Sequence, residues 1–209
     1  TSPDGQSKRI IFLSMELLHG ETLHNRIRRS GPLTSAEAFP LIRQMASALE
    51  SAHRAGVIHR DFKSANVMLV PRRNDAEEIR TVVTDFGLAR PAVPASDLST
   101  SVHLAAIAGT PAYMAPEQIE GGEITAAVDI YAMGIVLYEM VTGTVPFSGD
   151  TPLSCMVKRL KEPPPSPRRV VPSLEPHWER AILRCLETNP ADRFASAAQV
   201  SDALKGELA

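Results

Sequence analysis

Hydrophobic residues recur every three or four positions in TSAEAFPLIRQMASALESAHRAG, residues 34–56. This spacing places them on one face of a helix. Thr34 and Glu37 stand three residues apart at its start, as in a capping box. The pattern predicts a helix over residues 34–56, and residues 22–29 predict a shorter helix before it.

The chain after Pro116 also carries apolar residues at helical spacing. Gly143 and the stretches PPPSPRR and NPADRF interrupt the pattern, because glycine and proline end helices. We therefore expect helices at residues 125–142, 151–161, 175–187 and 196–207.

Strand-like sequence is confined to the first half of the chain. IIFLSMELL (10–18) is apolar and bounded by polar residues, which predicts a buried strand. NVMLV (66–70) and IRTVVT (79–84) flank the polar stretch PRRNDAEE and predict a β-hairpin. Residues 91–110 are rich in Pro, Ala, Ser and Thr without a period and predict a long surface segment. These elements indicate an α+β fold that is mainly helical.

The composition is that of a globular protein. The chain has 209 residues, of which 44% are hydrophobic, enough to bury one core in a single domain. The formal net charge of -2 gives no reason to expect binding to nucleic acid or to an anionic membrane. The longest apolar stretch, residues 130–141, is too short to span a bilayer. Cys155 and Cys185 stand apart in the sequence, as expected for buried thiols in a reducing compartment.

The stretch HRDFKSANVML, residues 59–69, carries the strongest chemical signal. On a loop, Asp61, Lys63 and Asn66 can converge on one phosphoryl group as proton acceptor, cation and metal-binding amide. Small-molecule phosphotransferases use a related pattern, so this stretch alone does not decide the substrate. Asp85 follows the second hairpin strand in TDFGLAR and is a candidate second metal ligand opposite Asn66.

Five motifs occur in one order: HRDFKSAN, DFG, GTPAYMAPE, DIYAMG and NPADRF. In these motifs the chain resembles the large lobe of a eukaryotic-type protein kinase, most like the serine/threonine kinases of bacteria. The resemblance implies a protein-kinase-like fold in which residues 1–18 are a remnant of the small lobe with the hinge, and 19–209 form the C-terminal lobe. It places the catalytic loop at 57–66 and the activation segment at 85–117.

The resemblance also assigns roles to individual residues. Asp61 is expected to be the catalytic base, Lys63 the contact to the γ-phosphate, and Asn66 and Asp85 the magnesium ligands. His59 and Phe86 would stack beneath the site.

Further residues are expected to hold this arrangement in place. Glu117 would form a buried ion pair with Arg193, and Asp129 would hold the catalytic-loop backbone from below. Gly87 completes the DFG motif.

The resemblance implies an adenine site at the hinge. Met15 matches the gatekeeper position, and Glu16 to Leu18 match the hinge whose backbone would bond adenine. Met68 matches the position beneath the purine.

Lys63 and Thr110 match the serine/threonine branch of the family, so serine or threonine is the expected acceptor. Arg60, beside the base, can pair with a phosphorylated activation segment. Ser99, Thr100 and Ser101 lie in that segment and are candidate phosphorylation sites.

Three elements of the family pattern do not occur in the sequence: a glycine-rich loop, a strand lysine and a helix glutamate that pairs with it. We therefore expect these residues to be an N-terminally truncated fragment that is nearly inactive alone. ATP and Mg²⁺ are the expected cofactors and proteins the expected substrates. We expect a cytoplasmic location, and the sequence leaves open a membrane anchor after Ala209 and a dimeric parent.

Three alternatives compete with an active protein kinase. A pseudokinase would keep the fold, although the motif residues Asp61, Asn66 and Asp85 are intact. A small-molecule phosphotransferase of the aminoglycoside or choline type would share the Asp61 motif but is not expected to carry GTPAYMAPE. A purely helical scaffold is at odds with the predicted hairpin.

Overall fold

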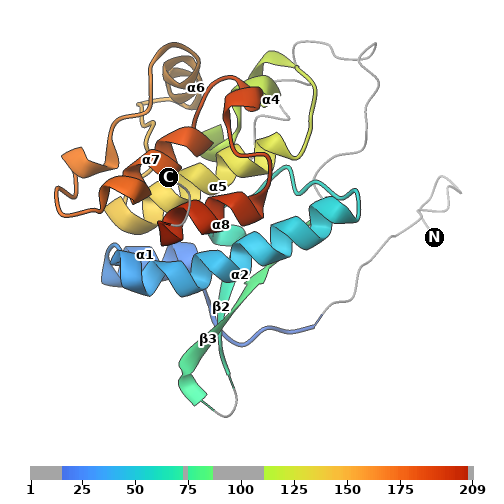
Figure 1. The fold of residues 1–209 in the computed structure, drawn as a ribbon, viewed down its shortest axis with the longest axis vertical. Coiled ribbons are helices and arrows are strands. Elements are labelled where there is room, and N and C mark those ends of the chain that lie inside the picture. The colour runs from blue at the N-terminus through green and yellow to red at the C-terminus, as the bar shows by residue number, and fades with distance from the viewer. Residues whose placement is uncertain (1–15, 73–74, 87–110, 207–209) are drawn as a thin grey trace, which may run out of the picture.

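The computed structural model describes residues 16–72, 75–86 and 111–206. The helices are α1 (Leu23–Ser30), α2 (Ser35–Arg54), α4 (Pro116–Glu120), α5 (Ala127–Thr142), α6 (Pro152–Lys161), α7 (Pro176–Cys185) and α8 (Ala197–Lys205). The strands are β1 (Glu21–Thr22), β2 (Val67–Arg72) and β3 (Asp75–Val83), and short 3₁₀ turns cover Ser64–Asn66, Pro111–Tyr113, Pro167–Arg169 and Pro190–Asp192. The expected α+β, mainly helical architecture is confirmed (Figure 1).

Helix α5 is the centre of the core. Its residues from Val128 to Thr142 are all buried, as expected for a helix that is apolar on every side. Helices α2 and α7 pack against α5, and α8 packs against both α2 and α7 (Figure 1). A Cβ atom at Gly134 would lie 2.6 Å from the Cβ of Cys185, so the glycine allows α5 and α7 to approach closely.

Helix α2 begins with the predicted capping box. The backbone N–H of Glu37 donates to Thr34 Oγ1 at 3.3 Å, and the N–H of Thr34 donates to Glu37 Oε2 at 2.8 Å. The later helices lie where the apolar spacing predicts them, within two residues at each end.

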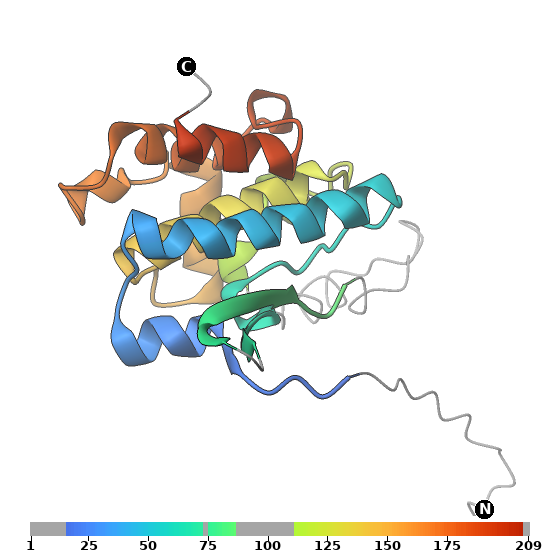
Figure 2. The same cartoon turned by 60° about the horizontal axis from the view of Figure 1, so that its bottom comes forward.

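The sheet is antiparallel with strand order β1-β2-β3. Val67 pairs with Val83, which confirms the predicted hairpin. Strand β3 begins at Asp75, earlier than predicted, because backbone pairing extends into the polar stretch that was interpreted as a turn. Figure 2 shows the hairpin and α8 on opposite sides of α2.

The predicted strand at residues 10–18 is wrong where it can be compared. Residues 16–18 form no strand, and Glu16 and Leu17 are exposed; residues 10–15 lie outside the described residues. A strand needs a neighbour to pair with, and in the described part of the chain β2 pairs with β1 and β3 instead. The predicted surface segment at 91–110 also lies outside the described residues.

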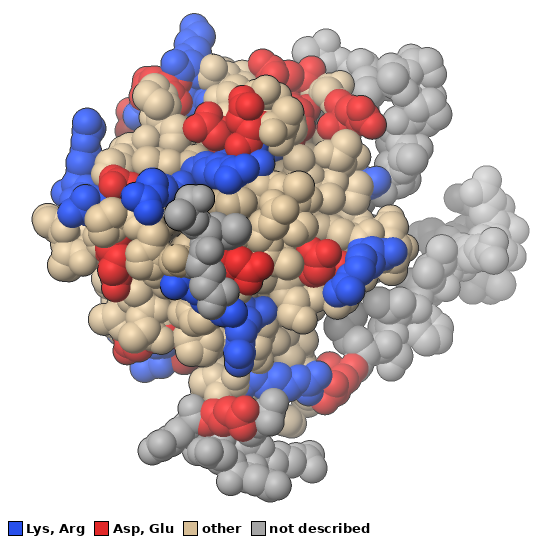
Figure 3. Space-filling model, in the orientation of Figure 1, with Lys and Arg blue, Asp and Glu red and all other residues tan. Residues whose placement is uncertain are grey.

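Both cysteines are free. Cys185 is buried as expected, and burial raises the pKa of its thiol to about 12, whereas Cys155 is only half-buried. No helix in residues 16–206, so far as they are described, is both long and apolar enough to cross a membrane. Acidic and basic side chains are interspersed on the face seen in Figure 3.

Candidate active site

The loop between α2 and β2 brings the three predicted catalytic residues together. Lys63 Nζ lies 2.7 Å from Asp61 Oδ2. The Asn66 amide donates through Nδ2 to the Asp61 carbonyl at 2.9 Å and reaches its carboxylate at 3.4 Å. The 3₁₀ turn Ser64–Asn66 brings the chain back onto Asp61 in this way.

A buried carboxylate on α5 holds the start of this loop. Asp129 is fully buried and accepts hydrogen bonds from the backbone N–H groups of His59 and Arg60, both at 2.8 Å. Arg60 has a φ of 67°, a strained conformation for a side chain of this size, and the bonds to Asp129 stabilise it. The expected role of Asp129 as the loop's support agrees with these contacts.

The Nε2 atom of His53 lies 2.7 Å from the same Asp129 carboxylate. His53 was not predicted as part of the site, because a basic residue in the last turn of a helix is explained by the helix dipole alone.

The other end of the site lies just after β3. The N–H of Thr84 donates to the Asn66 carbonyl at 2.9 Å, so Thr84 lies beside Asn66. Asp85 is the next residue along the chain. Asp85 has a φ of 63°, and its exposed carboxylate has no hydrogen-bond partner among the described residues. The two left-handed non-glycine residues of the described chain therefore flank one site, as strained residues often do.

His59 joins the two halves of the site. Its Nε2 lies 2.9 Å from the Thr84 carbonyl oxygen, and its ring centroid lies 4.7 Å from that of Phe86, with the two ring planes tilted by 46°. The expected contact of His59 with Phe86 is present. Phe62, which the sequence analysis did not single out, is fully buried and completes this cluster at 5.6 Å from His59.

The donor set of the site fits a magnesium ion bound with a nucleotide. Asn66 uses its amide nitrogen toward Asp61, and its oxygen accepts no hydrogen bond from a described residue. The carboxylate of Asp85 is likewise free of described partners, and both groups offer oxygen atoms, which Mg²⁺ prefers. The described residues contain no group of three or more potential metal-binding His, Cys, Asp or Glu side chains. Mg²⁺ typically takes one or two protein carboxylates and completes its shell with phosphate and water.

A second segment, residues 111–118, packs against the catalytic loop. The Tyr113 hydroxyl lies 3.0 Å from Ser64 Oγ and donates to Glu139 Oε2 at 2.6 Å. Burial, together with the neighbouring Glu139 carboxylate, raises the pKa of the Tyr113 phenol, so it stays protonated as a donor. Gln118 adds a bond from Nε2 to the Arg60 carbonyl at 3.0 Å. These contacts were missed, because no local pattern marks them.

The ion pair expected between Glu117 and Arg193 is present. The guanidinium donates to both carboxylate oxygens, at 2.7 and 2.8 Å. Arg193 also donates to the carbonyl oxygens of Ala127, Glu187 and Thr188. The pair therefore ties α4 to α5 and to the loop after α7.

The remaining predicted site residues are less well placed. Leu18 is half-buried and Glu16 exposed at the start of the described chain, and Met68 is half-buried on β2, opposite Thr22. The residues that lie outside the described part of the chain are Met15, Gly87, Ser99, Thr100, Ser101 and Thr110.

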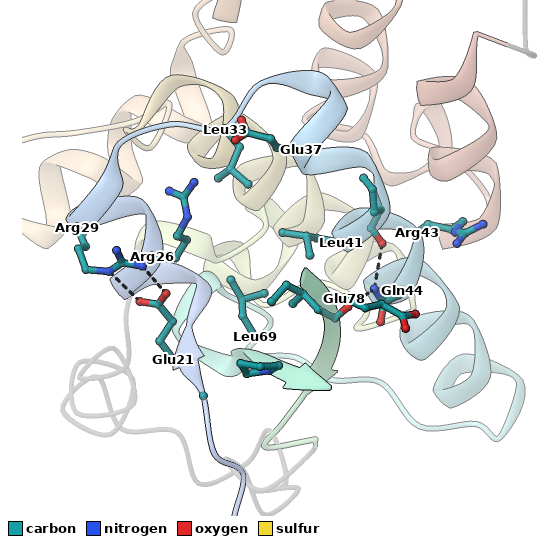
Figure 4. A pocket seen from close by; sticks show the side chains of 14 residues that line it. Glu21, Arg26, Arg29, Leu33, Glu37, Leu41, Arg43, Gln44, Leu69 and Glu78 are labelled. Carbon is teal, nitrogen blue, oxygen red and sulfur yellow. Dashed lines mark hydrogen bonds and ion pairs between the residues drawn. The ribbon is translucent and has the colours of Figure 1, made fainter. Parts of the chain in front are cut away.

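A cavity of about 650 Å³ opens elsewhere, between α1, α2 and the sheet (Figure 4). Leu33, Leu41 and Leu69 line its apolar part, and an ion pair between Glu21 and Arg29 lies at its edge. None of the predicted catalytic or metal-binding residues lines it.

A loop carboxylate with an adjacent lysine and amide, next to a hairpin and supported by a buried helix, is the arrangement that the resemblance to protein kinases implies. Comparison with known proteins agrees, since the family model described as "Protein kinase domain" matches residues 5–204. The chain belongs to the protein kinase family, in its bacterial serine/threonine branch.

Two similar relatives are bacterial proteins. The chain is 41% identical over 200 residues to serine/threonine-protein kinase pkn3 of Myxococcus xanthus, covering 95% of this chain and 36% of that protein. It is 44% identical over 184 residues to serine/threonine-protein kinase PkaA of Streptomyces coelicolor, covering 88% of this chain and 32% of that one. The chain thus spans about a third of the length of these two relatives.

Solved structures share the fold. The PknI kinase domain of Mycobacterium tuberculosis superimposes with a TM-score of 0.68 at 25% identity, covering 92% of this chain and 64% of that chain. Rad53 in complex with AMP-PNP gives a TM-score of 0.71 at 24% identity, covering 90% of this chain and 44% of that chain. A protein-kinase fold is confirmed, and the hypothesis of a purely helical scaffold is wrong.

Proposed function

We propose that residues 19–209 are the C-terminal lobe of an active serine/threonine protein kinase, which transfers the γ-phosphoryl group of ATP to serine or threonine hydroxyls of proteins. The grouping of Asp61, Lys63 and Asn66 within hydrogen-bond distance of one another carries this proposal. Residues 1–18 are the end of the small lobe and the hinge, and the backbone of Glu16 to Leu18 would bond adenine over Met68.

Asp61 is the catalytic base in this proposal. Its carboxylate, about one-third exposed, can reach an incoming hydroxyl, orient it and accept its proton. Lys63, whose ammonium group lies beside that carboxylate, would then contact the transferred phosphoryl group and offset its charge.

Asn66 and Asp85 would hold magnesium through their side-chain oxygens. The bonds of Thr84 to the Asn66 carbonyl join the segment just before β2 to the segment just after β3, which carries Asp85. When bound, the ion neutralises charge on the nucleotide phosphates. The hydrogen bond from Asn66 to the Asp61 carbonyl would hold the base close to the metal ligands.

We expect the 209-residue chain alone to transfer phosphoryl groups slowly. Its rate should be about 10³-fold or more below that of a protein that also carries the glycine-rich loop and strand lysine, because positioning of the phosphates supplies most of the catalysis. The sequence contains neither element. Transfer of label from γ-labelled ATP to a protein substrate measures both rates. The D61N variant of the longer protein controls for contaminating kinases, and equal rates for the two chains would contradict the proposal.

Phosphorylation of the activation segment would switch this site. Arg60 directly precedes the base in the sequence, and its guanidinium would pair with a phosphate on Ser99, Thr100 or Ser101 and so order the segment. Mass spectrometry of the active protein is expected to find phosphate on at least one of these three residues. Active protein without phosphate between residues 91 and 108 would contradict this expectation.

A further inference from the structure

Arg159 is a fully buried cation in the second half of α6, with 1% of its surface exposed. Its Nη1 donates to the carbonyl oxygens of Pro111 at 2.6 Å and Met114 at 2.7 Å, and its Nη2 donates to that of Ala112 at 2.7 Å. Its Nε atom is buried without a hydrogen-bond partner. All three described hydrogen bonds of the side chain therefore go to one short stretch of backbone, residues 111–114.

The charge of Arg159 is not compensated by an acid. No carboxylate of the described residues forms an ion pair with it, and the aromatic ring of Phe147 lies 5.5 Å from its guanidinium carbon. Burial accordingly lowers the pKa of the guanidinium. A methionine would fill a similar volume without the penalty of burying a charge, so core packing alone does not explain an arginine here.

Arg159 supplies three hydrogen bonds to the backbone of residues 111–114. One backbone hydrogen bond is described within this segment. It runs from the Met114 N–H to the Pro111 carbonyl and is long, at 3.3 Å. The half-buried side chains of Pro111, Ala112 and Met114 leave part of the segment accessible. Tyr113 joins it to the catalytic loop through Ser64, the residue after Lys63.

We infer that Arg159 is a positioning residue for the protein acceptor: it sets residues 111–114 against the catalytic loop, so that an acceptor peptide lies along this segment with its hydroxyl at Asp61. This inference rests on the proposed function and extends it to substrate recognition. No described hydrogen bond joins Arg159 or residues 111–114 to Asn66 or Asp85, so the ATP-directed part of the site should not depend on Arg159.

Steady-state kinetics of the longer, active protein test this role. R159M is expected to lower kcat/KM for a peptide substrate by about tenfold or more, mainly through KM, because misplacing a substrate-positioning segment weakens productive binding. The KM for ATP should stay within about twofold of the wild-type value. The kcat/KM of R159K for the peptide should fall between the values of the wild-type protein and R159M. The donors of a lysine lie on one nitrogen atom and cannot reach three carbonyl groups at once.

Lys158 provides the matched control. It precedes Arg159 on α6, and among the described residues its exposed ammonium group donates to the Ser148 carbonyl alone, at 2.8 Å. K158M should leave both KM values unchanged. An unchanged peptide KM in R159M, or parallel increases in the KM of peptide and ATP, would overturn the inference.

Hydrogen exchange in the 209-residue chain separates this inference from the proposed function. R159M should speed amide exchange in residues 111–118 by about tenfold or more, with α5 unaffected. Unchanged exchange would overturn the inference even if the longer protein is an active kinase. Faster exchange, together with a longer wild-type protein that transfers no phosphate, would instead show that the proposed function had failed.

Discussion

Replacing Asp61 with asparagine is expected to lower the rate of phosphoryl transfer in the active protein by about 10² to 10⁴-fold, the usual contribution of a general base. Asparagine has the same size and keeps an oxygen that can accept the long bond from Asn66. It cannot accept a proton from the substrate hydroxyl, so the loss should appear in kcat.

Stability should change little in D61N. The ion pair with Lys63 is lost, but Asp61 is about one-third exposed, and pairs of this kind contribute about 1 kcal/mol or less. D150N makes the same chemical change at an exposed residue and should leave kcat unchanged. A D61N enzyme with wild-type kcat would show that Asp61 is not the base.

Replacing Glu117 with glutamine is expected to destabilise the 209-residue chain by about 3 to 5 kcal/mol, the usual effect of removing one partner of a buried ion pair. The Arg193 side chain is completely buried, so E117Q leaves its charge without a carboxylate. Urea denaturation followed by circular dichroism measures the change as a lower midpoint at constant slope.

The E120Q variant is a matched control for E117Q, because Glu120 lies on the same short helix and is exposed. It should change the free energy of unfolding by less than about 0.5 kcal/mol. In E117Q combined with R193M, part of the lost stability should return, since no unpaired buried charge remains. A shift in E117Q as small as in E120Q would contradict the structural role of the pair.

The sequence predicted the features that depend on local pattern. The helices follow apolar spacing, the start of α2 follows from Thr34 and Glu37, and the hairpin follows from two apolar runs around a polar one. The grouping of Asp61 with Asn66 was also predictable, because they stand five positions apart on one loop.

The features that sequence analysis missed depend on contacts between distant segments. His53 meets Asp129 across 76 positions, and Arg159 meets Ala112 across 47. Neither residue differs from an ordinary helix cation in sequence. At residues 16–18, the described end of the strand predicted at 10–18, the prediction failed for the same reason, since an apolar run specifies a strand only where a neighbouring strand pairs with it.

The central claim is that Asn66 and Asp85 hold a divalent cation together with a nucleotide beside Asp61. Nuclear magnetic resonance of the ¹⁵N-labelled chain tests this directly, with Mn²⁺ replacing Mg²⁺ in the presence of AMP-PNP, because the paramagnetic ion broadens signals near its site even when binding is weak. The account predicts selective broadening of the Asn66 side-chain amide and the Asp85 backbone amide, with Ala181 in α7 unaffected. If Mn²⁺ and nucleotide broaden other residues and leave Asn66 and Asp85 sharp, the proposed active site is wrong.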